Sequence, residues 1–155
     1  MIPKFRAWHQ TWEEMGQVKR IRFDDEGNVT TVLFKGKLLG VNTHVDEIEL
    51  MQSTGLKDKN GMEIFEGDIL KFNDEWNDYC YEGYVDGTIE GINFVEIERE
   101  TTCFTFGKFQ TSESSLLYFM RDEYLSFKDL ITDKKFEFEI IGNIYENPEL
   151  LEVEE

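Results

Sequence analysis

Residues 50–70 read LMQSTGLKDKNGMEIFEGDIL, and this stretch decides how the chain folds. It places three glycines, Gly55, Gly61 and Gly67, between short apolar segments. Because glycine reaches the positive φ angles that tight turns need, the stretch predicts a compact, turn-rich crossing between an N-terminal sheet and a second β unit. These residues explain folding better than they explain chemistry.

Two tight bends are expected within the crossing, at Asp58–Gly61 and at Glu66–Asp68, and the second leads into a strand at Ile69–Phe72. The segment Asn73–Tyr81 is polar with large rings, and we expect a loop there. Aromatic and β-branched residues favour strands in the segments that follow. These strands are expected at residues 82–88, 92–97 and 103–109.

Upstream of the crossing, the sequence predicts a β-hairpin formed by Met15–Phe23 and Val29–Lys35. The connection Asp24–Asn28 contains a glycine and an asparagine, which readily adopt the positive φ angles of a hairpin turn. A weaker alternation predicts a strand at Lys4–His9. We therefore expect an N-terminal sheet.

The last part of the chain carries mixed patterns. Ser112–Leu130 fits either a buried strand or a helix face, with a short helix expected between residues 122 and 130. Phe136–Ile140 alternates apolar and acidic residues, which predicts a strand with the apolar side chains inward. The Asn147-Pro148 pair predicts one helical turn near the end of the chain.

These elements predict a mainly β fold with little helix. Residues 1–66 are expected to form an N-terminal β-hairpin region and the turn-rich crossing. Residues 67–155 supply five short strands, enough for a small SH3-like barrel that closes its sheet edges. The hairpin region is expected to pack on the barrel, so that the two parts form one compact unit.

Composition predicts a folded, cytoplasmic protein. The 155 residues are 40% hydrophobic and 14% aromatic, far richer in rings than a disordered chain. Cys80 and Cys103 lack the spacing of a metal site or a disulfide framework and are expected to be reduced. No apolar run has the length of a signal-peptide core or a membrane span, so no membrane partner is expected.

The formal net charge of −17 argues against direct nucleic-acid binding, because affinity for phosphates depends on basic groups. It is compatible with a soluble protein, with a basic partner, or with a chain that imitates nucleic acid. The alternative of direct nucleic-acid binding would use the positive charges near the N-terminus, which alternation places on outward faces. These are Lys4, Arg6, Lys19, Arg20 and Arg22.

No catalytic, cofactor or metal site is expected. Five oxygen-bearing side chains at Asp58, Asn60, Glu63, Glu66 and Asp68 invite a calcium site, but their spacing is not that of an EF-hand loop, and turn chemistry explains them better. A thiol nucleophile or zinc site would need the cysteines to meet His9 or His44, which nothing in the spacing indicates. A small metal-dependent enzyme using Asp58, Glu66 and Asp68 is the alternative from another class.

Four aromatic residues stand close together in a polar setting, and they are the candidate interaction surface. They are Trp76, Tyr79, Tyr81 and Tyr84. Amphipathic rings are favoured at protein interfaces because they bury a large area at small entropic cost. The competing interpretation is that these rings cover the core of the second unit.

Three blocks of the sequence resemble the YopX family of phage and prophage proteins. They are Lys4–Trp8, Met51–Ile69 and Ile141–Leu151, in the family's order. The resemblance implies a small β-rich fold encoded in phage or prophage DNA, with no established biochemical activity and no agreed catalytic residues. Asn73–Lys135 carries no motif of the family.

Taken together, these patterns favour a non-enzymatic phage or prophage accessory protein that acts as an acidic protein-interaction module. Its expected partner is a host or phage protein, and a second copy of the chain is a further candidate. The alternatives are a DNA mimic that inhibits a DNA-binding host protein, and the metal-dependent enzyme.

Overall fold

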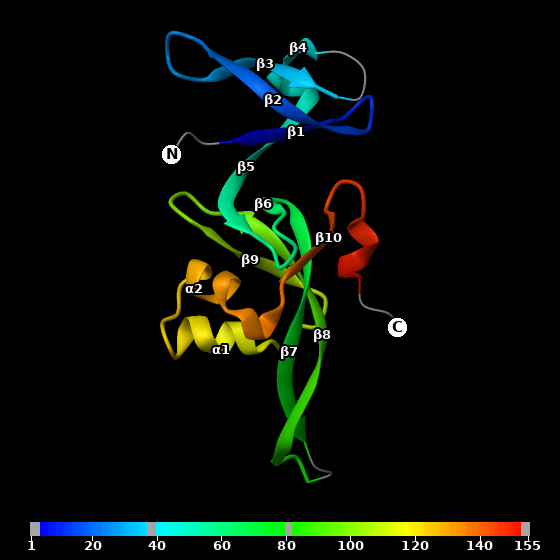
Figure 1. The fold of residues 1–155 in the computed structure, drawn as a ribbon, viewed down its shortest axis with the longest axis vertical. Helices are drawn as coiled ribbons and strands as arrows, with labels where there is room; N and C mark the ends of the chain where they lie inside the picture. Colours follow the sequence, from blue (N-terminus) through cyan, green and yellow to red (C-terminus); the bar gives the residue numbers. More distant parts are fainter. Residues whose placement is uncertain (1–3, 37–39, 80–81, 153–155) are drawn as a thin grey trace. The chain divides into compact units, whose positions relative to one another are not determined.

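The computed structural model describes residues 4–36, 40–79 and 82–152. The chain divides into two compact units, Met1–Gly55 and Leu56–Glu155. This boundary comes earlier in the chain than the division after Glu66 that the sequence suggests. The prediction of a mainly β protein is confirmed, since two antiparallel sheets account for most of the regular structure (Figure 1).

The first unit is an antiparallel sheet in the order β4-β3-β2-β1-β5 (Figure 1). The predicted hairpin is confirmed, with Ile21 directly opposite Val32. Apolar side chains from alternate positions of the strands form the core, including Ala7 and Phe34. The elements are β1 (Phe5–His9), β2 (Glu14–Phe23), β3 (Val29–Lys35), β4 (Gly40–His44), the 3-10 turn η1 (Val45–Glu47) and β5 (Ile48–Lys57).

The crossing is only partly a series of turns. The two predicted bends are confirmed, because the Gly61 amide donates to the Asp58 carbonyl at 3.0 Å and both Gly61 and Gly67 have positive φ angles of 80° and 85°. The beginning of the stretch is instead extended as the long strand β5. Strand β6 (Glu63–Phe65) follows β5 in the strand order of the first sheet.

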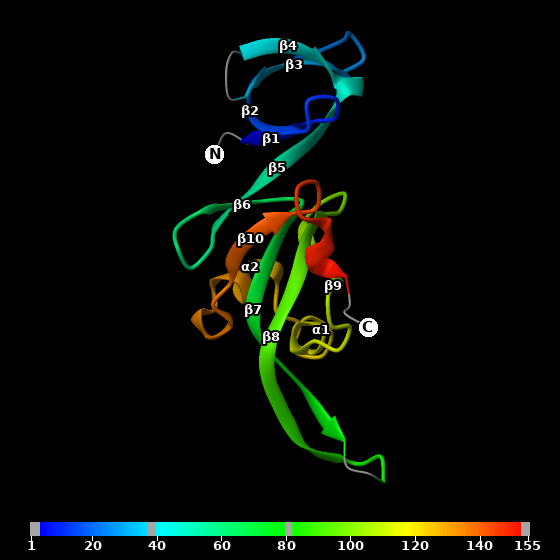
Figure 2. The ribbon, with the colours of Figure 1, turned by 90° about the vertical axis from the view of Figure 1, so that its right-hand side faces the viewer.

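The second unit is built on a four-stranded antiparallel sheet in the order β10-β7-β8-β9. Helices pack on this sheet (Figure 2). Strand β6 also lies in this unit, and its Ile64 is part of the same core. The elements are β7 (Asp68–Tyr79), β8 (Val85–Arg99), β9 (Phe104–Phe109), α1 (Ser115–Arg121), α2 (Phe127–Thr132), η2 (Lys134–Phe136), β10 (Glu139–Asn143) and η3 (Pro148–Leu151).

The prediction of a loop at Asn73–Tyr81 is wrong for Asn73–Tyr79, because β7 continues to Tyr79, and Cys80 and Tyr81 lie outside the described residues. The segment lacks a buried apolar face, since both faces of its strand pair are largely open to solvent. Antiparallel strands tolerate such exposure, so polarity alone does not argue against a strand.

The ambiguous region Ser112–Leu130 forms helices and no strand. Helix α2 lies close to the predicted position and begins with a capping box between Ser126 and Asp129. Helix α1 begins after Ser114, whose hydroxyl oxygen accepts a hydrogen bond from the Leu116 amide at 3.2 Å. The buried face of these helices contacts the phenylalanine-rich core of the second unit.

The predicted strand at Phe136–Ile140 is largely wrong. Phe136 ends the turn η2, Glu137 takes a left-handed conformation with φ 48°, and β10 begins only at Glu139. The predicted burial is nevertheless confirmed, since Phe136 and Phe138 are both buried and Phe138 stacks on Phe72 at 5.1 Å. The predicted C-terminal helical turn is confirmed as η3.

Candidate functional site

The pairing of β7 with β8 continues well past the rest of the sheet. Strand β10 pairs with β7 no further than Lys71, and β9 pairs with β8 from Val95 onward. The remaining residues, 73–79 and 82–92, form a two-stranded hairpin, which we call the arm. Figures 1 and 2 show the arm projecting beyond α1 and the other elements of the second unit.

The arm carries the aromatic residues that the sequence singles out. Tyr84 is 72% exposed beside the hairpin turn, whereas Trp76 is half-buried within β7. The backbone of Tyr79 belongs to β7, but its side chain and the whole of Tyr81 lie outside the described residues. The structure therefore places two of the four predicted rings on one projecting element, which is not the core of the unit.

Sequence reasoning missed the aliphatic part of this surface. Val85, Ile89 and Ile92 are 58%, 40% and 52% exposed on β8. Ile89 lies directly opposite Trp76 across the strand pair. Exposed apolar side chains on an otherwise acidic element are typical of an interaction surface. Their position on a strand that leaves the sheet could not be deduced without the pairing register.

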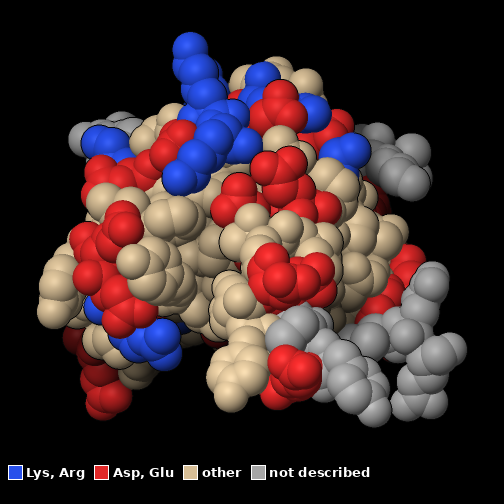
Figure 3. Space-filling model, turned by 90° about the horizontal axis from the view of Figure 1, so that it is seen from below, with Lys and Arg blue, Asp and Glu red and all other residues tan. Residues whose placement is uncertain are grey.

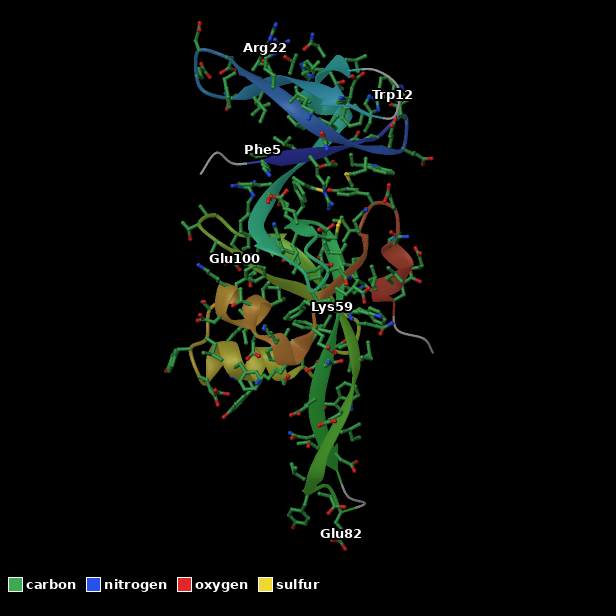
Figure 4. The ribbon with its side chains drawn as sticks, viewed as in Figure 1. Phe5, Trp12, Arg22, Lys59, Glu82 and Glu100 are labelled. Carbon is green, nitrogen blue, oxygen red and sulfur yellow. The ribbon has the colours of Figure 1, made fainter. Side chains whose placement is uncertain are left out.

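The arm is uniformly acidic. Residues 73–92 contain six Asp and Glu residues and no Lys or Arg. Glu75 and Glu90 face each other directly across the strand pair, an arrangement in which like charges destabilise a hairpin. Glu82 lies at the tip and points away from the unit (Figure 4). Figure 3 shows acidic side chains spread among uncharged ones on the face seen from below.

A buried polar network attaches the base of the arm to helix α1. The Asp74 carboxylate is 2% exposed and accepts hydrogen bonds from the Ser115 hydroxyl at 2.7 Å, the Ser115 amide at 2.9 Å and the Asn93 side-chain amide at 2.9 Å. Asn93 is fully buried and also bonds both backbone groups of Thr111. Because every one of these groups has a partner, the network holds the arm in place and leaves no reactive group.

Two hollows flank the arm. One of about 580 Å³ is bordered by Trp76 and Asn77 of the arm and by Leu117 and Tyr118 of α1. The other, of about 450 Å³, is bordered by Asn73 and Glu75 and by the rings of Phe119 and Phe136. Lys135 lies over both rings, with its ammonium nitrogen 4.3 Å and 4.9 Å from their centres. Apolar walls with a few polar groups suit the side chains of a bound polypeptide.

One carboxyl group of the sheet titrates abnormally. Burial, together with a hydrogen bond and charge repulsion from Glu98, raises the pKa of Glu96 to about 7. The backbone and the charge of Lys108 act in the opposite direction. Glu96 and Glu98 lie on β8 beyond the arm, so the carboxyl pair belongs to the sheet and not to the exposed surface.

The acidic residues of the crossing hold turns. Asp58 accepts backbone hydrogen bonds from Asn60 and Met62, both at 2.9 Å, and from Ile140 at 3.0 Å. Asp68 accepts the Phe65 amide at 2.8 Å, and Glu66 pairs with Arg99 at 3.3 Å. Within the described ranges, no three acidic, cysteine or histidine residues gather as metal ligands would.

The remaining candidate residues have local roles. His9 is buried, accepts the Trp12 amide at 3.1 Å and stacks on the Trp12 ring at 3.9 Å. His44 accepts the Asp46 amide at 3.2 Å, and Cys103 is exposed near Glu100. Cys80 lies outside the described residues.

The basic residues of the first unit do not dominate its charge. Lys19, Arg20 and Arg22 are exposed on β2, and Arg20 bonds Asn42 at 3.4 Å. The unit up to Gly55 contains seven basic residues (Lys and Arg) and eight acidic residues (Asp and Glu). The second unit contains nine basic residues and 25 acidic residues. The acidity of the chain is therefore concentrated in the unit that carries the arm.

Across the residues described, the helices are too short or too polar to cross a membrane. A comparison with curated proteins found no match. Among solved structures, the chain resembles the crystal structure of protein EF1440 from Enterococcus faecalis, with a TM-score of 0.60 and 29% identity over 98% of this chain and 99% of that one. The model of the YopX protein family matches residues 4–152. Because that match spans nearly the whole chain, the protein belongs to the YopX family.

Proposed function

We propose that the protein is a non-enzymatic phage or prophage accessory protein that binds a partner protein with a basic surface through the arm. The observation that carries this proposal is the opposition of Glu75 and Glu90 on an exposed hairpin without a single basic residue. Like charges in this position weaken a hairpin, and a cationic partner relieves the repulsion.

The apolar residues of the arm supply the second requirement of an interface. Ile89 lies on the same face of the arm as Trp76 and Ile92 lies on the opposite face, so each face exposes an apolar side chain with acidic residues beside it. Buried aromatic and aliphatic anchors contribute most of the affinity in protein interfaces, and charged rims mainly contribute specificity and association rate. An isolated two-stranded hairpin is marginally stable in water, so a partner that covers it also stabilises it.

A DNA-binding protein is the partner class favoured by the uniform charge of the arm. Its basic groove is complementary to closely spaced carboxylates, as it is to phosphates. In this variant the purified protein competes with duplex DNA for a host repressor or restriction enzyme. Absence of competition at low salt excludes DNA mimicry and leaves the broader interaction role untouched.

The experiment is affinity capture from bacterial lysate with three baits. They are the unaltered protein, Ile89→Ser in the arm, and Tyr124→Ser as a matched control at a side chain that is 88% exposed away from the arm. We expect the unaltered protein and Y124S to retain the same partner, I89S to lose it, and salt to release it. Equal capture by all three baits contradicts the proposal.

A further inference from the structure

We infer that the partner binds as an extended basic strand added to the outer edge of β7 in the arm. This inference rests on the proposed function and specifies its binding mode. Within the described chain, no strand pairs with β7 on this edge beyond Lys71. An unpaired edge offers backbone donors and acceptors to another extended segment.

Phe94 shows which backbone groups reach that edge. Its carbonyl accepts the Gln110 amide at 2.9 Å and its own amide donates to the Asn93 side chain at 2.8 Å, so both groups point away from β7. Lys71 lies opposite Phe94 and therefore points its backbone groups toward β10. Since this direction alternates along an antiparallel strand, Glu75 and Asn77 direct their backbone groups to the outer edge. The Glu75 amide donates to the Asp74 carboxylate at 2.8 Å, so Asn77 is the residue whose amide the incoming strand would use.

The charges of the arm select which strand can bind. A second copy of the arm would bring its own carboxylates beside Glu75 and Asp78, and this repulsion disfavours edge-to-edge pairing between copies. A strand with alternating basic residues has the complementary charge. The hollow of about 450 Å³ beside Asn73 and Glu75, with its walls of Phe119 and Phe136, receives the side chains on one face of such a strand.

The edge can be blocked without disturbing the hairpin ladder. Asn77→Pro removes one outward amide from β7, and proline is tolerated where an edge amide faces solvent. Asn77 lies opposite Thr88, so Thr88→Pro removes the equivalent outward amide from the other edge of the same hairpin. The two variants are matched in chemistry and differ only in the edge that they block.

The test titrates the isotope-labelled protein with a synthetic peptide of alternating lysine and valine, followed by NMR and amide hydrogen exchange. We expect the peptide to protect the Asn77 amide and to bind N77P about tenfold more weakly, with T88P within about twofold of the unaltered protein. A lysine–glycine peptide of equal charge, which disfavours a strand, is expected to bind weakly. Thermal unfolding of both variants checks that each is folded.

Other outcomes overturn the inference in distinguishable ways. If N77P and T88P weaken peptide binding equally, or if neither variant weakens it, pairing at the β7 edge is excluded. If I89S weakens peptide binding and N77P does not, the arm binds through side chains and the proposed function stands alone. If the protein self-associates through the β7 edge, the strand that binds there belongs to a second copy of the chain. No binding by any peptide at millimolar concentration and low salt contradicts both proposals.

Discussion

The ring of Trp76 lies directly over Gly91. A methyl group built on Gly91 would come within 2.6 Å of the outer edge of the indole, closer than packed atoms approach. The two residues lie on neighbouring strands of the arm, and Trp76 is half-buried by this contact. The glycine thus provides the space in which a large ring covers an otherwise bare part of a two-stranded hairpin.

Gly91→Ala is expected to displace the indole and to loosen the arm by about 1 kcal/mol. Faster amide hydrogen exchange in residues 73–79 and 85–91 reports this change. Gly40→Ala is the control, because a methyl group there would meet Leu33 at an ordinary 3.7 Å. Unchanged exchange in G91A would show that the Trp76 contact does not stabilise the arm.

Asp74→Ala is expected to destabilise the second unit by about 3 kcal/mol, because it removes the acceptor shared by the buried Asn93 side chain and the partly buried Ser115. Denaturant unfolding measures the loss. Asp78→Ala, at an exposed position of the same strand, is expected to have little effect. Equal stability of the two variants would show that the network does not attach the arm to α1.

Because the pKa of Glu96 is raised to about 7 in the folded state, the stability of the fold is expected to fall as the pH rises. Between the ordinary pKa near 4.5 and this raised value, the folded state binds more protons than the unfolded state. The stability contributed by Glu96 is therefore present at low pH and is lost as the pH rises through this window.

Glu96→Gln removes this contribution to the pH dependence. We expect the melting temperature of E96Q to fall less than that of the unaltered protein between about pH 5 and 7.5. Glu100→Gln, at an exposed position nearby, should leave the slope unchanged. If the melting temperatures of E96Q and the unaltered protein change with pH in the same way, Glu96 is not the source of the pH dependence.

Tyr124 takes a left-handed conformation, with φ 55°, although its side chain is 88% exposed and gains little from packing. Asparagine tolerates this conformation better than tyrosine. Tyr124→Asn is therefore expected to stabilise the protein by about 0.5–1 kcal/mol in denaturant unfolding. Tyr124→Ala relieves no strain of this kind, and an equal gain in Y124A would assign the effect to the loss of the ring.

The sequence predicted the local features of the fold better than its long-range pairing. The Asp24–Asn28 turn and the bends at Gly61 and Gly67 follow from residue chemistry that acts within a few positions, and these predictions are confirmed. The burial of Phe136 and Phe138 also followed from alternation, but the left-handed Glu137 gives the same burial without a strand.

The arm is the part that the sequence could not predict. Asn73–Tyr79 has no apolar face because β8 is its only strand partner there, so the alternation that identifies half-buried strands is missing. Of the candidate aromatic residues, Trp76 and Tyr84 lie on this one element, and Ile89 lies beside Trp76 only through the register of the strand pair. That register is fixed by pairing across the hairpin, which no short window of sequence contains.

We expect the location of the arm's carboxylates, and not the net charge of −17, to determine binding to a cationic partner. Calorimetric titration with the lysine–valine peptide tests it on two variants of equal net charge. One neutralises the arm with Glu75→Gln, Asp78→Asn and Glu90→Gln, and the other neutralises exposed sites elsewhere with Asp25→Asn, Glu123→Gln and Glu149→Gln. We predict that only the arm variant loses binding, and an equal loss in both variants would contradict the claim.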